Sequence, residues 1–242
     1  MKSRIRESYN KHCKEYHQKM QDPKTSFWNR YVEWPALRSL LKPVVKNKKI
    51  ADIGCGSGIH TRKIIALGGK VKGIDLSEAM IKTARQENPK IEFHVGSVEK
   101  TPFQNNEFDV AVSGLVAHYI KNLKPFFKEA HRILKRGGLF VFSMHHPSSE
   151  VFKKITIARK KEKLFGDYFH NQSYEWNMLG GMDLISYHHT FENIINSLND
   201  CGFTTERIIE ARACKGSRTH DPGSYDKSHK HPFFLIVKAR KL

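Results

Sequence analysis

A short apolar strand that runs into a glycine loop most constrains what this 242-residue chain can fold into. Residues 50–53 are mainly apolar, and glycines follow at positions 54, 56 and 58. A second apolar segment ends in Asp75, seventeen residues after Gly58. Bare backbone at the first strand end lets a ligand approach closely, and a carboxylate at the second can accept hydrogen bonds from both ribose hydroxyls. The pair predicts an α/β fold that binds a nucleoside-containing cofactor.

The spacing of the glycines argues against a dinucleotide. The dinucleotide fingerprint is G-x-G-x-x-G, in which the third glycine allows close helix packing and the pyrophosphate lies at the helix N-terminus. Ile59 occupies that third position here, and Asp52 precedes the loop. A nicotinamide-dependent oxidoreductase is therefore the weaker interpretation of this loop.

From residue 49 onward, strand and helix patterns alternate as a doubly wound parallel sheet requires. Ser77 and Thr190 are predicted helix N-caps, and Gly137-Gly138 is predicted to end the helix before the fifth strand. The predicted strands are 49–53, 70–75, 91–95, 108–113, 139–144, 203–209 and 233–238.

Two segments lie outside this alternation. Residues 1–45 predict a helical cover, with one helix over 3–20 and another before Pro43. Residues 147–187 predict a cap insertion, which begins with a basic amphipathic helix from 151 through 163, because long loops at strand carboxyl ends commonly hold sites. Residues 213–231 predict a polar loop. We interpret residues 1–242 as one domain.

Five stretches of the chain resemble the successive motifs of the class I S-adenosylmethionine-dependent methyltransferases. The motif D-x-G-x-G-x-G, with Asp75 after the second strand, resembles motif I and its acidic partner. The others are Gly96-Ser97-Val98, Phe108-Asp109-Val110 and Arg132–Gly138. The resemblance implies a Rossmann-like seven-stranded, mostly parallel sheet in the order 3-2-1-4-5-7-6, with an antiparallel last strand.

Shorter stretches resemble a bacterial subgroup of small-molecule methyltransferases that shares features with ubiquinone-pathway methyltransferases. These stretches are 115–119, His146-Pro147, Tyr168 to Trp176, His188-His189-Thr190 and 231–235. The resemblance therefore implies S-adenosyl-L-methionine as cofactor and a small molecule as methyl acceptor.

The resemblance also assigns residues to the cofactor. Asp52, directly or indirectly, and loop carbonyls would accept from the ammonium group, and Asp75 would accept from the ribose. The family usually has Gly-Asp-Ala where this chain has 96–98, so the neutral Ser97 should hold the adenine amino group less firmly. The complete implied set is Asp52, Gly54, Gly56, Asp75, Leu76, Met80, Ser97, Val98 and Ser113.

The chemistry of the acceptor is less well defined by the sequence. Methyl transfer from a sulfonium is an in-line displacement, so the protein mainly aligns the reactants and excludes water. A base is needed only if the acceptor must lose a proton, and His118, His146 and His189 are the candidates because they follow predicted strand ends. Tyr119 and Trp176 are candidate walls of the acceptor pocket, with core packing as the alternative.

Missing motifs narrow the acceptor further. Residues 113–116 read Ser-Gly-Leu-Val where amino-methylating members often carry Asn/Asp-Pro-Pro-Tyr, which disfavours adenine-N6 and glutamine-amide methylation. No Pro-Cys occurs, which disfavours a covalent cysteine mechanism on pyrimidine C5. Oxygen, nitrogen and carbon acceptors in a small molecule all stay open.

The charge of the chain supports an alternative acceptor. The formal net charge is +18, and residues 1–49 hold thirteen Lys/Arg against four Asp/Glu. Such a balance suggests an RNA (tRNA) methyltransferase whose basic N-terminal surface binds nucleic acid, although a solvated basic surface explains it as well. A protein that binds the cofactor without transferring its methyl group is the third hypothesis.

The remaining composition sets expectations about compartment and metals. Cysteines 13, 55, 201 and 214 form no C-x-x-C pair, so we expect neither disulfides nor a metal site. We expect no membrane span, because no apolar run reaches the length of about eighteen residues that one requires. The basic N-terminus also lacks the apolar core of a signal peptide, so we expect a cytoplasmic protein.

Overall fold

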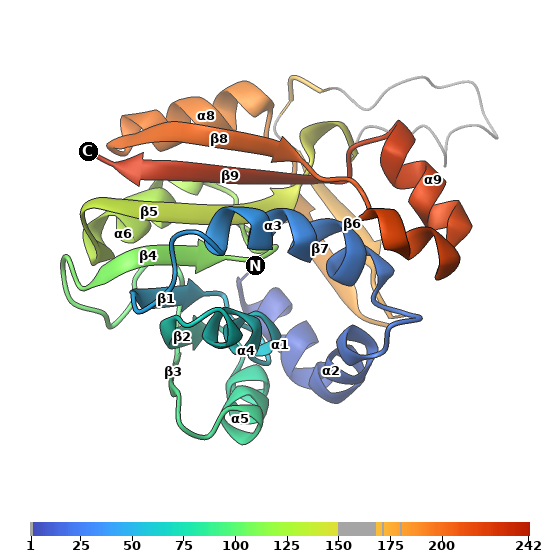
Figure 1. Cartoon of the computed structure of the whole chain (residues 1–242), viewed down its shortest axis with the longest axis horizontal. Coiled ribbons are helices and arrows are strands. Elements are labelled where there is room, and N and C mark those ends of the chain that lie inside the picture. The colour runs from blue at the N-terminus through green and yellow to red at the C-terminus, as the bar shows by residue number, and fades with distance from the viewer. Residues whose placement is uncertain (1, 150–167, 171, 180) are drawn as a thin grey trace.

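The computed structural model describes residues 2–149, 168–170, 172–179 and 181–242, and it is built around one seven-stranded sheet (Figure 1). The sheet order is β3-β2-β1-β4-β5-β9-β8, which confirms the predicted order with β8 as the sixth strand and β9 as the seventh. The strand β9 runs antiparallel to both neighbours, and the other pairs are parallel. In chain order the strands are β1 Lys49–Ile53, β2 Lys70–Asp75, β3 Glu92–Val95, β4 Phe108–Ser113, β5 Leu134–His145, β8 Phe203–Glu210 and β9 Phe234–Lys241.

Alternate side chains of the central strands enter two separate cores. In β1, Ile50 packs on one face of the sheet, whereas Ala51 and Ile53 pack on the other. The helices α3 (Trp34–Leu41) and α4 (Ile59–Ala66) cover the first face, and α6 (Leu123–Ile133) and α8 (Phe191–Asp200) cover the second (Figure 1). Burial on both faces explains why these strands are nearly unbroken apolar runs.

Both predicted N-caps are present. The Ser77 hydroxyl accepts the backbone N–H of Met80 at 3.1 Å and begins α5 (Glu78–Glu87). The Thr190 hydroxyl accepts the N–H of Asn193 at 3.1 Å and begins α8. Each cap satisfies one of the backbone donors that the first helical turn leaves unpaired.

Three local predictions were wrong. The strand β5 begins at Leu134, and Gly137, with φ +72°, lies within it at a shift in the β4–β5 register. The predicted helix over 3–20 is two helices, α1 (Lys2–Lys11) and α2 (Cys13–Gln21). The predicted loop 213–231 contains a 3-10 helix, η3 (Lys215–Thr219), and α9 (Pro222–Lys230), whose N-cap Asp221 accepts the N–H of Ser224 at 2.9 Å.

The described part of the predicted cap contains a hairpin. The strands β6 (Ser173–Asn177) and β7 (Asp183–Tyr187) pair antiparallel to form a second, two-stranded sheet. The helix α1 is joined to the hairpin by Arg4, which pairs with Glu175 at 2.8 Å, and by Ser8, which donates to the Asp183 carbonyl at 2.8 Å. The basic amphipathic helix predicted over 151–163 lies outside the described residues.

Between α2 and α3 the chain forms a π-helical turn, η1 (Trp28–Glu33), and after β4 it forms a short 3-10 turn, η2 (Ala117–Tyr119). None of the helices that the structure describes has the length and apolar character to cross a membrane.

Candidate active site

A large cavity opens at the carboxyl ends of β1, β2, β4 and β5. Its volume is about 2180 Å³, whereas a pocket for one drug-sized ligand holds roughly 300–1,000 Å³. The glycine loop, Asp75 and η2 contribute to its floor, and residues of α1, α2 and β6 line it from above the sheet. The cavity therefore has room for a cofactor and an acceptor together.

The glycine loop has the conformation that only glycine adopts readily. Gly54, Gly56 and Gly58 all have positive φ angles, of +83°, +53° and +80°. A Cβ atom at Gly54 would lie 2.3 Å from Cγ2 of Val116, whereas a Cβ at Gly56 would meet no atom within 4 Å. Because Gly56 lines the cavity, its open side is the place where a ligand can approach bare backbone.

Two backbone donors orient the Asp75 carboxylate at the end of β2. Its Oδ2 accepts the N–H of Gly56, and its Oδ1 accepts the N–H of Ser77, both at 2.9 Å. Burial raises the pKa of Asp75, although the bonds from Ser77 and Gly56 oppose that shift. Each oxygen retains a second lone pair on the cavity side of the loop, where a vicinal diol can donate to both.

Asp52 lies beneath the glycine loop and does not line the cavity. Its side chain is 1% exposed, and Oδ2 accepts the Thr61 hydroxyl at 2.6 Å. Within the described residues Oδ1 has no hydrogen-bond partner, and burial raises the Asp52 pKa to about 6. A cation beside the loop would compensate this buried, half-satisfied carboxylate, so the donor set fits an ammonium group held directly or through an intermediary.

The remaining residues predicted to bind the cofactor separate into two groups. Leu76, Met80, Ser97 and Val98 line the cavity beyond Asp75. Ser113 does not, because its hydroxyl donates to the Ile53 carbonyl at 2.8 Å and is fully buried between β4 and β1. The assignment of Ser113 to the cofactor surface is therefore corrected to a bond between strands.

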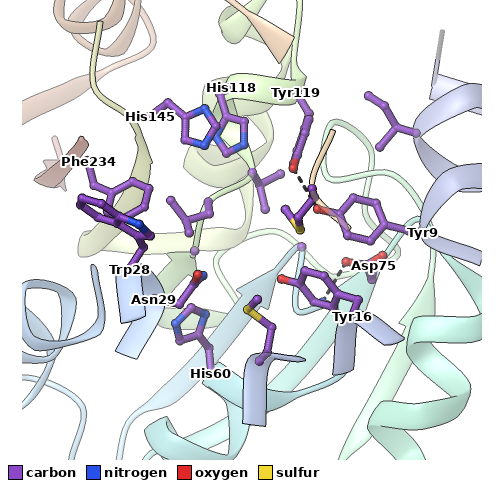
Figure 2. Close-up of a pocket in the computed structure, with 18 of the residues that line it drawn as sticks. Tyr9, Tyr16, Trp28, Asn29, His60, Asp75, His118, Tyr119, His145 and Phe234 are labelled. Carbon is purple, nitrogen blue, oxygen red and sulfur yellow. Dashed lines mark hydrogen bonds between the residues drawn. The ribbon is translucent and has the colours of Figure 1, made fainter. Parts of the chain in front are cut away.

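Two stacked imidazoles face the cavity on the side away from Asp75. The rings of His118, in η2, and His145, at the end of β5, lie 3.8 Å apart with an interplanar angle of 7° (Figure 2). Nδ1 of His145 and the Tyr174 hydroxyl lie 3.0 Å apart. His118 was among the residues predicted from the sequence, whereas His145 was not, although its place at a strand carboxyl end could have indicated it.

The other two candidate histidines lie outside the lining of the cavity. Nε2 of His146 faces Glu210 at 3.1 Å, and Nε2 of His189 faces the Ile120 carbonyl at 2.8 Å. Burial lowers the pKa of both histidines. Their candidacy as bases is corrected, because their ring nitrogens are used in contacts that join loops to the core.

Tyr119 faces the cavity together with two tyrosines of the N-terminal helices. The hydroxyls of Tyr9 and Tyr119 lie 2.9 Å apart, and the rings of Tyr9 and Tyr16 meet edge to face at 5.5 Å (Figure 2). Burial raises the pKa of all three phenols. They therefore stay protonated at neutral pH and act as hydrogen-bonding groups.

Five rings on the far side of the cavity form what we term the aromatic wall. The ring centroids of Trp28 and Phe233 are 4.2 Å apart, those of Phe234 and His145 are 6.0 Å apart, and those of His145 and Trp176 are 5.4 Å apart. Trp28 and Phe234, which lie 6.5 Å apart, link the two ends. Figure 2 shows Trp28 and Phe234 across the cavity from Asp75.

A buried carboxylate, Glu33, contacts His60, a residue that lines the cavity. Glu33, the last residue of η1, is fully buried, and its oxygens face Nε2 of His60 at 3.1 Å and the Ser143 hydroxyl at 2.7 Å. Burial alone would raise the Glu33 pKa, but His60, Ser143 and Lys63 together hold it below the usual value. His60 in turn stacks on Trp34 at 5.5 Å, and both line the cavity. No sequence motif pointed to Glu33 or His60.

Comparison with known proteins identifies the family. Residues 51–142 match the model of a methyltransferase domain. A solved S-adenosylmethionine-dependent methyltransferase from Mesorhizobium loti is 30% identical, with a TM-score of 0.72 over 86% of this chain and 97% of that one. An uncharacterized protein from Haemophilus influenzae is 29% identical over 228 residues, which are 88% of this chain and 89% of that protein.

A third relative is named for its acceptor. A demethylmenaquinone methyltransferase from Chlorobaculum parvum is 36% identical over 121 residues, which are 49% of this chain and 50% of that protein. The glycine loop, the Asp75 carboxylate and the sheet order agree with these similarities. The chain belongs to the class I S-adenosylmethionine-dependent methyltransferases, with S-adenosylmethionine as its cofactor.

Proposed function

We propose that this methyltransferase acts on an oxygen, nitrogen or carbon atom of a small molecule that binds between the cofactor and the aromatic wall. The observation that carries the proposal is the division of the cavity. Asp75 and the glycine loop form its polar side, and the aromatic wall with the stacked histidines forms the other (Figure 2).

The elements that line the cavity above the sheet favour a small acceptor. Arg6 pairs with Glu78, and Asn10 accepts the N–H of Ala79 at 3.1 Å, so α1 is held across the start of α5. Lys19 of α2 donates to the Met178 carbonyl at 2.9 Å, beyond the end of β6. An acceptor under these segments is shielded from water, which methyl transfer requires.

The cofactor-binding residues have defined tasks in this proposal. Bound S-adenosylmethionine supplies an electrophilic methyl group on a sulfonium. Asp75 accepts the ribose hydroxyls, Gly54 and Gly56 give the methionine end access to backbone, and Asp52 offsets the ammonium charge from below. Leu76, Met80, Ser97 and Val98 surround the adenine.

On the acceptor side, the stacked histidines are candidates for holding a proton. Two imidazolium rings 3.8 Å apart would repel each other, so the stacking of His118 and His145 disfavours a proton on both rings together. Where the acceptor must lose a proton, a neutral ring of this pair can accept it. Tyr119 and Trp176 complete the walls, and Trp176 is oriented by its Nε1–H bond to the Ser186 hydroxyl at 2.9 Å.

We also propose that residues 1–242 form one domain in which 1–45 and 147–187 cover the pocket. The RNA alternative relied on basic residues in two segments. One of these, 153–163, lies outside the described residues, and in the other Arg4 and Arg6 pair with Glu175 and Glu78. Family membership excludes the oxidoreductase alternative.

Transfer of labelled methyl groups tests the proposal. The protein is incubated with cell extract and S-adenosylmethionine tritiated on its methyl group, and the extract is then separated into small molecules, RNA and protein. We expect protein-dependent label in the small-molecule fraction. Label confined to RNA would establish the RNA alternative. No label in any fraction, with S-adenosylhomocysteine still bound in calorimetry, would establish a non-catalytic binding protein.

A further inference from the structure

The cavity carries an excess of positive charge. Its lining includes the cations Arg6, Lys19, Arg30, Arg62, Lys63, Lys121 and Lys227, against the carboxylates Asp75, Glu99 and Glu175. The cofactor does not neutralise this excess, because it brings a sulfonium and an ammonium against one carboxylate. A cavity with apolar walls concentrates such a field and attracts ligands of the opposite sign.

Ion pairs with the surrounding protein neutralise only two of these cations. Arg6 pairs with Glu78, and Arg62 pairs with Glu87 at 3.2 Å. The other five form no ion pair with a carboxylate in the part of the chain that the structure describes. Arg30 instead donates to the Gln21 carbonyl at 2.7 Å, and Lys63 lies 4.8 Å from the centre of the Trp34 ring.

The carboxylates of the lining cannot serve these five cations. In the proposed function Asp75 accepts the ribose hydroxyls of the cofactor, and Glu175 pairs with Arg4. Glu99 lies next to the Ser97 hydroxyl, 3.4 Å away, on the adenine side of the cavity. Outside the lining, the buried Glu33 interacts with Lys63, so the positive charge available to a ligand comes mainly from the other four cations.

Two of the five cations line the same cavity as the aromatic wall and lie close to its residues in the chain. Arg30 lies in η1 with Trp28, and Lys227 lies in α9, six residues before Phe233. The one described acidic residue of α9, Asp226, pairs with Arg218 at 3.8 Å, and the N-cap Asp221 interacts with Lys227 without approaching it closely enough for an ion pair. Stacking surface and cationic groups therefore line one and the same cavity.

We propose that the methyl acceptor is a planar aromatic molecule with an anionic group, whose ring stacks on the aromatic wall and whose charge lies beside Lys227 and Arg30. The inference rests on the proposed small-molecule function and names its substrate class. Aromatic rings favour offset or edge-to-face contact with such a molecule, and the cations add electrostatic selection for its charge.

The inference can be tested with two matched probe molecules, so the experiment does not require the acceptor itself. Naphthalene carboxylate and its neutral carboxamide have the same ring and differ in charge. All three tryptophans of the chain, Trp28, Trp34 and Trp176, line the cavity, so tryptophan fluorescence reports binding there. With S-adenosylhomocysteine present and at low salt, the carboxylate should bind about three- to five-fold more tightly than the amide.

A pair of variants locates the charge. Lys227→Gln should reduce the preference for the carboxylate about two-fold, whereas Lys230→Gln, which removes a lysine of α9 outside the cavity lining, should leave it unchanged. Melting temperature and S-adenosylhomocysteine affinity should be equal in both variants. The carboxylate should also inhibit tritium transfer into small molecules more strongly than the amide does.

Equal binding of the two probes, or equal effects of the two variants, would overturn the inference. Tritium in the small-molecule fraction together with either result would leave the proposed function standing, and only the substrate class would be wrong. Absence of tritium from that fraction would instead contradict the proposed function itself.

Discussion

Replacement of Gly56 by alanine should abolish tight cofactor binding while leaving the protein folded. A Cβ atom at this position meets no protein atom within 4 Å and projects into the space that the cofactor needs. The backbone has φ +53°, which costs an alanine about 1–2 kcal/mol of unfolding free energy. For a domain of this size that cost lowers the melting temperature by about 2–4 °C per kcal/mol.

The loss of binding can be estimated separately. An extra methyl group in a closely packed contact costs about 1–3 kcal/mol, so the dissociation constant for S-adenosylhomocysteine should rise about 5- to 150-fold. Isothermal titration calorimetry measures that constant, and chemical unfolding measures the stability.

Gly137→Ala is the matched control. Gly137 also has a positive φ, of +72°, and open space around its Cβ position, but it lies in β5 away from the cavity. It should lose as much stability as Gly56→Ala and bind S-adenosylhomocysteine normally. Wild-type affinity in Gly56→Ala, or the same loss of affinity in both variants, would refute this account of the glycine loop.

Three further predictions concern carboxylates and histidines of the site. Asp75→Asn places an amide NH₂ against one of the two backbone N–H donors that the carboxylate accepts. It should weaken S-adenosylhomocysteine binding about 10- to 100-fold in calorimetry. Asp109→Asn, at the edge of the sheet where the parallel strands begin, should leave binding unchanged. Asp52 keeps its proton to pH about 6 when folded but only to about 3.9 when unfolded, so the cofactor-free protein should lose stability as pH rises between these values. Urea titrations measure the free energy of unfolding of Asp52→Asn and of the wild type. The value for the variant minus that for the wild type should increase by up to about 3 kcal/mol from pH 4 to 7, and a difference that stays constant would contradict the assigned pKa. His145→Asn should slow tritium transfer at least about 10-fold with unchanged S-adenosylhomocysteine affinity, while His146→Asn should retain the transfer rate; equal rates in the two variants would argue against the histidine stack.

Much of the sheet could be predicted because its signals are local. The central parallel strands β1 and β4 are buried on both faces, so they read as nearly apolar runs, and helices α5 and α8 begin at the capping residues Ser77 and Thr190. The sequence placed β5 too late because a glycine pair usually ends a helix, whereas Gly137 here lies inside the strand at a register shift. It missed α9 because a polar segment carries little apolar periodicity, although Asp221-Pro222 is a recognisable helix start.

The candidate site likewise contains some residues that the sequence predicts and others that it does not. Asp75 and the glycines at 54 and 56 follow strands whose carboxyl ends must meet at one edge, so their convergence follows from topology. His145, Trp28 and Phe234 come from segments far apart in the chain, and no local pattern distinguishes a ring that faces a cavity from one that packs in a core. His118, His146 and His189 looked equivalent for that reason, and only their neighbours in space separate them.

The fold class and the cofactor could be read from the sequence, because both depend on short-range features: strand periodicity, the positions where glycine is required, and one carboxylate at a strand end. The surface that we propose for the acceptor could be recognised only in the folded protein. That surface is assembled from η1, β5, β6 and β9 together with the N-terminal helices, and its aromatic wall and cations form a group only once these segments have packed over the edge of the sheet.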